Sequence, residues 1–264
     1  MTSRRIPRVL SIAGSDSGGG AGIQADLKAF AACGAHGMTA ITAITAQNTV
    51  GVTAVHQIPP EVIVAQVRAV QDDIGIDAVK IGMLGTVATI AAVAHALDAL
   101  PQRTPVVLDP VMVATSGAEL LDRNARSKLT EQLLPRATVV TPNVPEALAL
   151  TGAEDGADGP ELARAVHALG PAVVVVTGGH REQAVDMFFD GERLVELSGE
   201  RYPDGAAHGS GCTHSSVLAA RLAWGDDPLL AARVAKEMAS SAVRNGLVGL
   251  GEGPGPVDVI GLRR

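Results

Sequence analysis

Residues 8–22 read Arg-Val-Leu-Ser-Ile-Ala-Gly-Ser-Asp-Ser-Gly-Gly-Gly-Ala-Gly, and they begin a pattern that the rest of the chain repeats. The first six have the apolar character of a buried strand, residues 14–20 predict a loop, and residues from about 21 to 33 predict a helix. Further strands are predicted over 38–46, 52–58, 77–82, 105–109, 138–141 and 171–177, and further helices over 60–74, 86–99, 122–134, 143–151 and 160–169. Residues 184–198 predict a hairpin that turns at Asp190-Gly191, and two final helices follow, one over 212–224 and one with Asp227 as its N-cap. Apolar strands that alternate with helices predict an α/β fold with a mostly parallel sheet covered on both faces.

The length of 264 residues is sufficient for a complete hydrophobic core. Aromatic residues make up only 2 % of the chain, so the core must consist mainly of Ala, Val, Leu and Ile. No internal repeat or long linker interrupts the alternation of strands and helices. We therefore expect a single domain over residues 1–264, with residues 1–7 as a flexible N-terminus.

Charge and cysteine content restrict the classes of partner. The formal net charge of −7 and the scarcity of aromatic side chains argue against a nucleic-acid partner, which needs basic and stacking residues. Cys33 and Cys212 are the only cysteines, too few for a disulfide framework. No signal peptide is recognisable, and no apolar run approaches the roughly 20 residues that span a bilayer. We therefore expect a cytoplasmic protein with no membrane partner.

Polar and glycine-rich segments follow six of the predicted strands. In open α/β sheets, ligands bind beyond the carboxyl ends of the strands, so these segments predict a single binding site. They comprise residues 16–22, 47–48, 80–83, 109–110, 141–143 and 177–180.

The turn His208-Gly-Ser-Gly-Cys-Thr213 leads into the predicted helix over 212–224. The free N–H groups and the positive end of the helix dipole make such a helix start an anion site. A thiol at this position, Cys212, is expected to have a lowered pKa and a raised reactivity. A capped helix with a buried structural cysteine is an equally good interpretation of this turn taken alone.

The loop over residues 14–22 lacks the G-x-G-x-x-G spacing of a dinucleotide site, and the chain has no P-loop motif. A pocket for a small flat ligand is the favoured interpretation, because glycine lets a ring approach the backbone. The Gln47 amide could bind the edge of a heteroaromatic ring or only satisfy local backbone. Met83 could form the floor of such a pocket or belong to the core.

Two carboxylates and one lysine are candidates for binding a metal and phosphates. Asp109 ends a buried strand and Glu146 lies in the first turn of the next helix, and oxygen ligands of this kind suit Mg²⁺. Glu146 is also interpretable as an ordinary acidic residue at a helix N-terminus. Lys236 lies on a largely apolar helix face, from which it could reach solvent or a phosphate.

These motifs resemble those of the hydroxymethylpyrimidine/phosphomethylpyrimidine kinases of thiamine biosynthesis. They occur in the family's order from residue 8 to about residue 245, and the first block and the Gly-Ser-Gly-Cys-Thr turn are the most specific. The matching segments are residues 11–28, 45–49, 80–84, 109–112, 141–143, 145–147 and 208–213.

The resemblance implies a ribokinase-like three-layer α/β/α sandwich around a central, mostly parallel sheet. It also implies transfer of the γ-phosphoryl group of ATP, with Mg²⁺, to the alcohol of 4-amino-5-hydroxymethyl-2-methylpyrimidine and then to its monophosphate. A homodimer is usual in the family. The implied residues are Gly14, Asp16, Ala21, Asp26, Thr45, Gln47 and Met83 for the pyrimidine, Cys212 with the anion hole Gly209, Ser210 and Gly211 for catalysis, Asn143, Thr177, Thr213 and Lys236 for ATP, and Asp109 and Glu146 for the metal.

The chain departs from the family pattern at four positions. Thr115 and Thr177 stand where lysines are usual, His214 stands where an apolar residue is common, and Ser210 replaces a threonine. The two missing cations predict weaker ATP binding or slower transfer unless Lys236, Arg181 or another cation substitutes for them.

Alternative functions also follow from these residues. A pyridoxal or pyridoxine kinase has a similar flat hydroxymethyl substrate, and a catalytically weak pyrimidine-binding regulatory protein would explain the missing lysines. The presence of Asp109, Glu146, Lys236 and Cys212 argues against the second alternative, because binding alone needs neither metal nor base. A sugar kinase is disfavoured because its aspartate base corresponds to Cys212 here.

Overall fold

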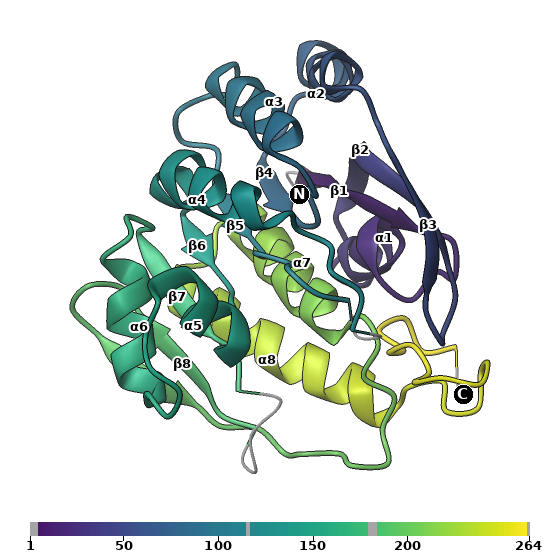
Figure 1. Ribbon diagram of the computed structural model, residues 1–264, viewed down its shortest axis with the longest axis vertical. Coiled ribbons are helices and arrows are strands. Elements are labelled where there is room, and N and C mark those ends of the chain that lie inside the picture. The colour runs from purple at the N-terminus through teal and green to yellow at the C-terminus, as the bar shows by residue number, and fades with distance from the viewer. Residues whose placement is uncertain (1–4, 115–116, 179–183, 263–264) are drawn as a thin grey trace.

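The computed structural model describes residues 5–114, 117–178 and 184–262, and its nine strands form one sheet (Figure 1). The strand order is β3-β2-β1-β4-β5-β6-β7-β8-β9. The six strands β2, β1, β4, β5, β6 and β7 are parallel to one another, whereas β3 pairs in antiparallel fashion with β2 at one edge and β8 and β9 pair in antiparallel fashion at the other. The strands are β1 (Arg8–Asp16), β2 (His36–Gln47), β3 (Val52–Gln57), β4 (Ala78–Ile81), β5 (Val106–Leu108), β6 (Val139–Val140), β7 (Val173–Val176), β8 (Asp186–Phe189) and β9 (Leu194–Leu197).

Helices cover both faces of the sheet, which confirms the predicted three-layer α/β/α fold. One face packs against α2 (Pro60–Asp73), α3 (Val87–Asp98), α4 (Arg123–Gln132), α5 (Val144–Thr151) and α6 (Gly159–His167). The other packs against α1 (Gly22–Ala32), α7 (Ser210–Ala223) and α8 (Pro228–Arg244). Among the helices of the described segments, none combines the length and the apolar character that a membrane span requires.

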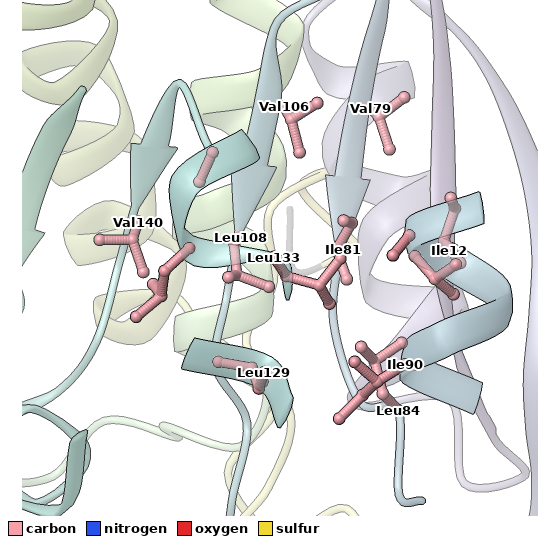
Figure 2. Packing of buried hydrophobic residues seen from close by; sticks show 14 of the residues in the cluster. Ile12, Val79, Ile81, Leu84, Ile90, Val106, Leu108, Leu129, Leu133 and Val140 are labelled. Carbon is pink, nitrogen blue, oxygen red and sulfur yellow. The ribbon is translucent and has the colours of Figure 1, made fainter. Parts of the chain in front are cut away.

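The central strands are mainly apolar because both of their faces are buried. In β4, Ala78 faces the α1–α7–α8 layer, whereas Val79 and Ile81 face the other layer. Figure 2 shows Ile81 and its counterparts on β1, β5 and β6 packed against side chains of the covering helices. Aliphatic side chains on alternate positions therefore hold the two outer layers to the sheet.

Two predicted boundaries are wrong for identifiable reasons. β1 continues to Asp16, beyond the predicted end at residue 13, because Ser15 and Asp16 pair with Ile44 and Thr45 of β2 after a register shift. The helix predicted over 122–134 ends at Gln132 and gives way to a 3-10 turn, Leu134–Arg136, that contains Pro135.

The hairpin predicted to turn at Asp190-Gly191 is confirmed. β8 and β9 pair in antiparallel fashion on either side of it, and Asp190 Oδ1 accepts the N–H groups of Glu192 and Arg193. Residues 1–4 of the predicted flexible terminus lie outside the described residues.

Candidate active site

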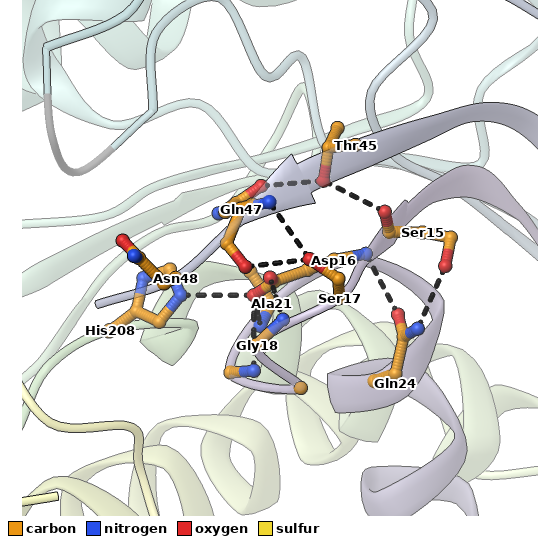
Figure 3. Close-up of polar contacts among 12 residues, drawn as sticks. Ser15, Asp16, Ser17, Gly18, Ala21, Gln24, Thr45, Gln47, Asn48 and His208 are labelled. Atoms are coloured by element: carbon orange, nitrogen blue, oxygen red, sulfur yellow. Dashed lines mark hydrogen bonds and ion pairs between the residues drawn. The ribbon is translucent and has the colours of Figure 1, made fainter. Parts of the chain in front are cut away.

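Asp16 organises the loop that follows β1 (Figure 3). Its Oδ1 accepts the N–H of Gly18 at 2.8 Å, and its Oδ2 accepts those of Gly20 at 3.1 Å and Ala21 at 2.8 Å. His208 Nε2 lies 3.1 Å from the same Oδ2. Although burial opposes it, these hydrogen bonds lower the pKa of Asp16. The Asp16 side chain is buried and bonded to the backbone of the loop, so its location does not support the predicted contact with a substrate. Asp16 shapes the loop instead.

The loop after β1 and the turn before α7 are in direct contact. The His208 ring lies against Gly20, where a Cβ atom would overlap it. Gly209 is the N-cap of α7 with φ +82°, and a Cβ atom there would overlap the carbonyl oxygen of Gly20. The two glycine-rich segments are far apart in the sequence, yet they form one surface because neither glycine carries a side chain.

Replacing Gly209 with alanine is expected to impair both stability and turnover. The left-handed backbone alone costs about 1–2 kcal/mol for a residue with a Cβ atom, and the overlap with Gly20 adds to this cost. Gly225, at the other end of α7, is the matched control, because it has φ +92° and a Cβ atom added there would meet no atom within 4 Å. Chemical denaturation and steady-state kinetics should show Gly225→Ala losing stability alone and Gly209→Ala losing kcat as well. Equal effects of the two variants on kcat would contradict the role assigned to this contact.

The structure brings four of the predicted pyrimidine residues together in two pairs. A Cβ atom at Gly14 would lie 3.3 Å from Met83 Sδ, so the ring of a ligand at this glycine would also meet Met83. Thr45 Oγ1 lies 3.0 Å from Gln47 Oε1 and 2.9 Å from the Ser15 carbonyl oxygen. Thr45 is buried and Gln47 is partly exposed, so Thr45 holds the amide in place rather than presenting its own hydroxyl.

A pocket of about 200 Å³ opens beside the loop after β1. The C-terminal segment contributes to it, which the sequence patterns did not indicate. Its lining residues are Gly18, Gly20, Asn48, Thr49, His208, Leu250, Gly251 and Pro256.

Asp26 lies in a buried network rather than at a surface. It has no exposed area, and its carboxylate accepts hydrogen bonds from Ser11 Oγ at 2.5 Å, Ser216 Oγ at 2.7 Å and Lys80 Nζ at 2.9 Å. Lys80 is also fully buried, and its Nζ lies 3.9 Å from Asp109 Oδ2. The predicted direct contact of Asp26 with a substrate is therefore not supported; Asp26 positions the Lys80 ammonium next to Asp109.

Asp109 and Glu146 are buried and close enough to influence each other. Burial, followed by repulsion from Asp109, raises the pKa of Glu146 to about 8. Burial is also the main reason why the pKa of Asp109 is raised. Glu146 forms a capping box with Asn143: its Oε2 accepts the Asn143 N–H and Asn143 Oδ1 accepts the Glu146 N–H, both at 2.9 Å. The interpretation of Glu146 as an acidic residue at a helix N-terminus is confirmed, since it caps α5. Its role as a metal ligand stays a prediction.

A divalent cation fits this pair of carboxylates, because it would offset their repulsion. No group of three or more His, Cys, Asp or Glu side chains arranged to hold a metal occurs within residues 5–114, 117–178 and 184–262. Mg²⁺ commonly uses only one or two carboxylates and completes its shell with water and substrate phosphates. The donor set at Asp109 and Glu146 therefore suits Mg²⁺ bound together with a nucleotide.

The prediction that the pKa of Cys212 is lowered is wrong. Burial raises the pKa of the thiol to about 12. Lys80 and the N–H of Gly22 oppose this shift, whereas Asp109 and Asp26 add to it. α7 begins at Ser210, two residues before the predicted start, so Cys212 lies in its first turn. The loss of water around the sulfur nevertheless outweighs the field of the helix. The thiol is therefore protonated at neutral pH in the ligand-free protein.

The residues predicted to bind ATP lie mainly around the end of β7. Thr177 bridges to Asn143, and its N–H donates to the Pro142 carbonyl oxygen at 2.8 Å. The Lys236 ammonium is largely buried and donates to Asp186 Oδ1 at 2.7 Å. Its contact with a phosphate stays a prediction. Thr213 is fully buried, and its Oγ1 has no hydrogen-bond partner in the described part of the chain. Thr115 and Arg181 lie outside the described residues.

Lys80 and Asp186 are charged residues of the site whose roles the sequence patterns missed. Each stands in a short strand that is otherwise apolar, Ala78–Ile81 for Lys80 and Asp186–Phe189 for Asp186. A charged residue in such a strand is costly unless it is paired, and this could have marked both positions. Their partners, however, come from distant parts of the chain.

Comparison with known proteins adds to this geometry. The family model described as phosphomethylpyrimidine kinase matches residues 16–258. The hydroxymethylpyrimidine/phosphomethylpyrimidine kinase of Rhizobium meliloti (strain 1021) is 49 % identical over 254 residues, which are 94 % of this chain and 95 % of the relative. The same-named protein of Streptomyces coelicolor is 46 % identical, with 96 % and 94 % covered.

Solved structures agree with these sequence matches. The ADP complex of Bacillus subtilis pyridoxal kinase has a TM-score of 0.87 at 40 % identity and covers 96 % of this chain and 97 % of its own. The phosphomethylpyrimidine kinase of Clostridium difficile 630 has a TM-score of 0.79 at 38 % identity, with 90 % and 100 % covered.

Proposed function

This chain belongs to the phosphomethylpyrimidine kinase family, and from that membership we propose its reaction. It is a kinase that transfers the γ-phosphoryl group of ATP to 4-amino-5-hydroxymethyl-2-methylpyrimidine and then to the monophosphate, in thiamine biosynthesis. The observation that carries the proposal is the contact between the loop after β1 and the Gly209 turn, which joins a pocket for a flat ring to an anion-binding helix start.

The charges around this contact suit phosphoryl transfer, which depends on positioning and on stabilising negative charge. The N–H groups at the start of α7 would bind the transferred phosphoryl group. Asp109 and Glu146 would hold Mg²⁺, which supplies positive charge to the ATP phosphates when bound. Cys212 would accept the proton of the substrate alcohol as a thiolate. The thiol proton of the ligand-free protein would first pass to water, because positive charge bound at Asp109 would lower the pKa of the thiol.

We propose that the nucleotide lies on the Lys236 side of α7. The Lys236–Asp186 ion pair is beside the N-terminal half of that helix, because His214 Nε2 lies 3.6 Å from Asp186 Oδ2. A pocket of about 390 Å³ adjoins Lys236, and three cations, Arg233, Lys236 and Arg244, line it together with the carboxylates of Glu200 and Glu237. The excess of positive over negative side chains would partly compensate for the threonine at position 177.

Pyridoxal phosphorylation is the alternative, because solved relatives of this chain are described as pyridoxal kinases, one of them in complex with ADP. The Thr45-oriented Gln47 amide favours an aminopyrimidine, since it offers a donor and an acceptor to the ring edge. The experiment supplies purified protein with ATP, Mg²⁺ and either compound, and follows the products by mass spectrometry.

We expect the pyrimidine monophosphate first and the diphosphate later, with no product when a chelator removes Mg²⁺. Phosphorylation of pyridoxal alone would replace the proposed substrate with the alternative. Binding of the pyrimidine without any product would instead indicate a binding protein that has lost catalysis.

We also propose that the protein is a homodimer that acts in the cytoplasm, where ATP is available. β3 is an edge strand of the sheet, and apolar side chains are exposed on it and on its neighbour, notably Ile44 at 49 % and Val55 at 44 %. A second copy would cover them. Sedimentation velocity should give a dimer, and cell fractionation should recover the protein with cytoplasmic markers.

A further inference from the structure

His214 is a buried histidine without a hydrogen bond in the described part of the chain. It lies in α7, two residues after Cys212, and is only 4 % exposed. Neither Nδ1 nor Nε2 has a hydrogen-bond partner within the described segments. Buried polar atoms are nearly always paired, so an imidazole in this condition calls for a reason beyond packing.

Asp186, an acceptor close to His214, is already shared with other donors. Asp186, 2 % exposed, accepts the Lys236 ammonium at 2.7 Å and the Gly178 N–H at 2.9 Å, both on Oδ1. Its other oxygen, Oδ2, lies 3.6 Å from His214 Nε2, just beyond hydrogen-bonding distance. A shift of roughly 0.6 Å would make this contact a hydrogen bond.

Lys236 is the group that must move if the proposed function is correct. It lines the 390 Å³ pocket, and its stem packs against Gly199, where a Cβ atom would lie 2.7 Å from Lys236 Cε. A phosphate in the pocket would draw the ammonium away from Asp186. The carboxylate would then be buried without a cation, which opposes nucleotide binding.

We propose that His214 is a positioning residue that donates a hydrogen bond to Asp186 Oδ2 when Lys236 turns toward a nucleotide phosphate. His214 thereby lowers the free-energy cost of releasing Lys236. The charged groups facing His214 are Asp186 of β8 and Lys236 of α8, and those facing Lys236 across the pocket are Arg233, Glu237 and Arg244 of α8 and Glu200 after β9.

The protonation state of His214 supports this role. Burial, and then the charge of Lys236, lower the pKa of His214, while Asp186 opposes the shift. The ring is therefore neutral at neutral pH and has one N–H to donate. Departure of Lys236 removes a repulsive charge and strengthens the attraction between the ring and Asp186.

The test compares His214→Leu, which removes the donor, with His214→Gln, which keeps an N–H group. ADP affinity is measured by calorimetry without pyrimidine, alongside KM for ATP and kcat. We expect His214→Leu to weaken ADP binding and raise KM for ATP about tenfold, the effect of a 1.4 kcal/mol change, with KM for the pyrimidine unchanged. His214→Gln should stay near the original protein. The melting temperature of His214→Leu should not fall, because leucine leaves no unpaired polar atoms in the core.

The Lys236→Met background separates this role from simple packing. There is no ammonium to release in that variant, so adding His214→Leu should change ADP affinity no further. An undiminished effect in the Lys236→Met background, or unchanged ADP affinity in His214→Leu alone, would overturn the proposal. This inference rests on the proposed function, which fails separately if the original protein itself neither binds ADP nor forms product.

Discussion

Alanine at position 212 is expected to lower kcat for phosphorylation of the hydroxymethyl group by about 10²–10⁴-fold, the range typical for loss of a general base. Cys212 lies in the first turn of α7, beside the anion-binding turn and within the field of the Lys80 ammonium. The variant keeps the backbone N–H groups of that turn. We therefore expect the variant to lose activity because proton transfer is slower, while its affinity for the substrates stays the same.

The raised pKa of Cys212 makes this prediction more specific. The thiol is protonated in the ligand-free protein because burial and the carboxylates of Asp109 and Asp26 outweigh Lys80. A cation held by Asp109 would cancel one of these carboxylates and leave the attraction of Lys80 less opposed. We therefore expect iodoacetamide to modify Cys212 faster when MgATP is bound than in the ligand-free protein.

The second phosphorylation should depend less on Cys212. Its nucleophile is a phosphate oxygen that is already ionised at neutral pH, so no base is needed, and we expect a loss of less than about tenfold in kcat. Cys33→Ala is the matched control, because this half-buried cysteine lies at the end of α1 and contacts Met238. Rapid-quench measurements on the alcohol and on the monophosphate test the difference. Equal losses in both steps would refute the role of the thiol as a base.

Methionine at position 80 is expected to destabilise the fold by about 3–5 kcal/mol, as for other buried pairs that lose one partner. The Lys80 side chain has no exposed area, and neither has Asp26, its 2.9 Å partner. Although burial opposes it, the Asp26 carboxylate raises the pKa of Lys80, so Lys80 keeps its ammonium form. Without the ammonium, Asp26 retains only the hydroxyl groups of Ser11 and Ser216 from among these neighbours.

Urea denaturation of three variants tests this expectation. Adding Asp26→Asn to Lys80→Met should recover part of the loss, because no unpaired charge then remains at this position in the core. Lys128→Met is the surface control, since its 3.4 Å pair with Glu131 is exposed and should contribute less than about 1 kcal/mol. A loss for Lys80→Met no larger than that for Lys128→Met would show that the buried pair does not stabilise the fold.

The sequence alone predicted the architecture because its signals are local. Strands such as Val173–Val176 are apolar at every position, as two-sided burial requires. The N-cap at Asp227 and the turn at Asp190-Gly191 depend on residues within three positions of one another. The matching motifs identified the family for the same reason, since each is a short contiguous segment.

The roles of individual side chains were decided by the tertiary structure. Lys236 pairs with Asp186, 50 residues away, and Ser216 with Asp26, 190 residues away. The pKa of Cys212 depends on burial and on the charges of Lys80, Asp109 and Asp26, which lie in other parts of the chain. The position of the thiol at a helix start therefore predicted the wrong direction for its pKa shift. Electrostatic effects depend on distance and on exclusion of water, and neither is known until folding brings these segments together.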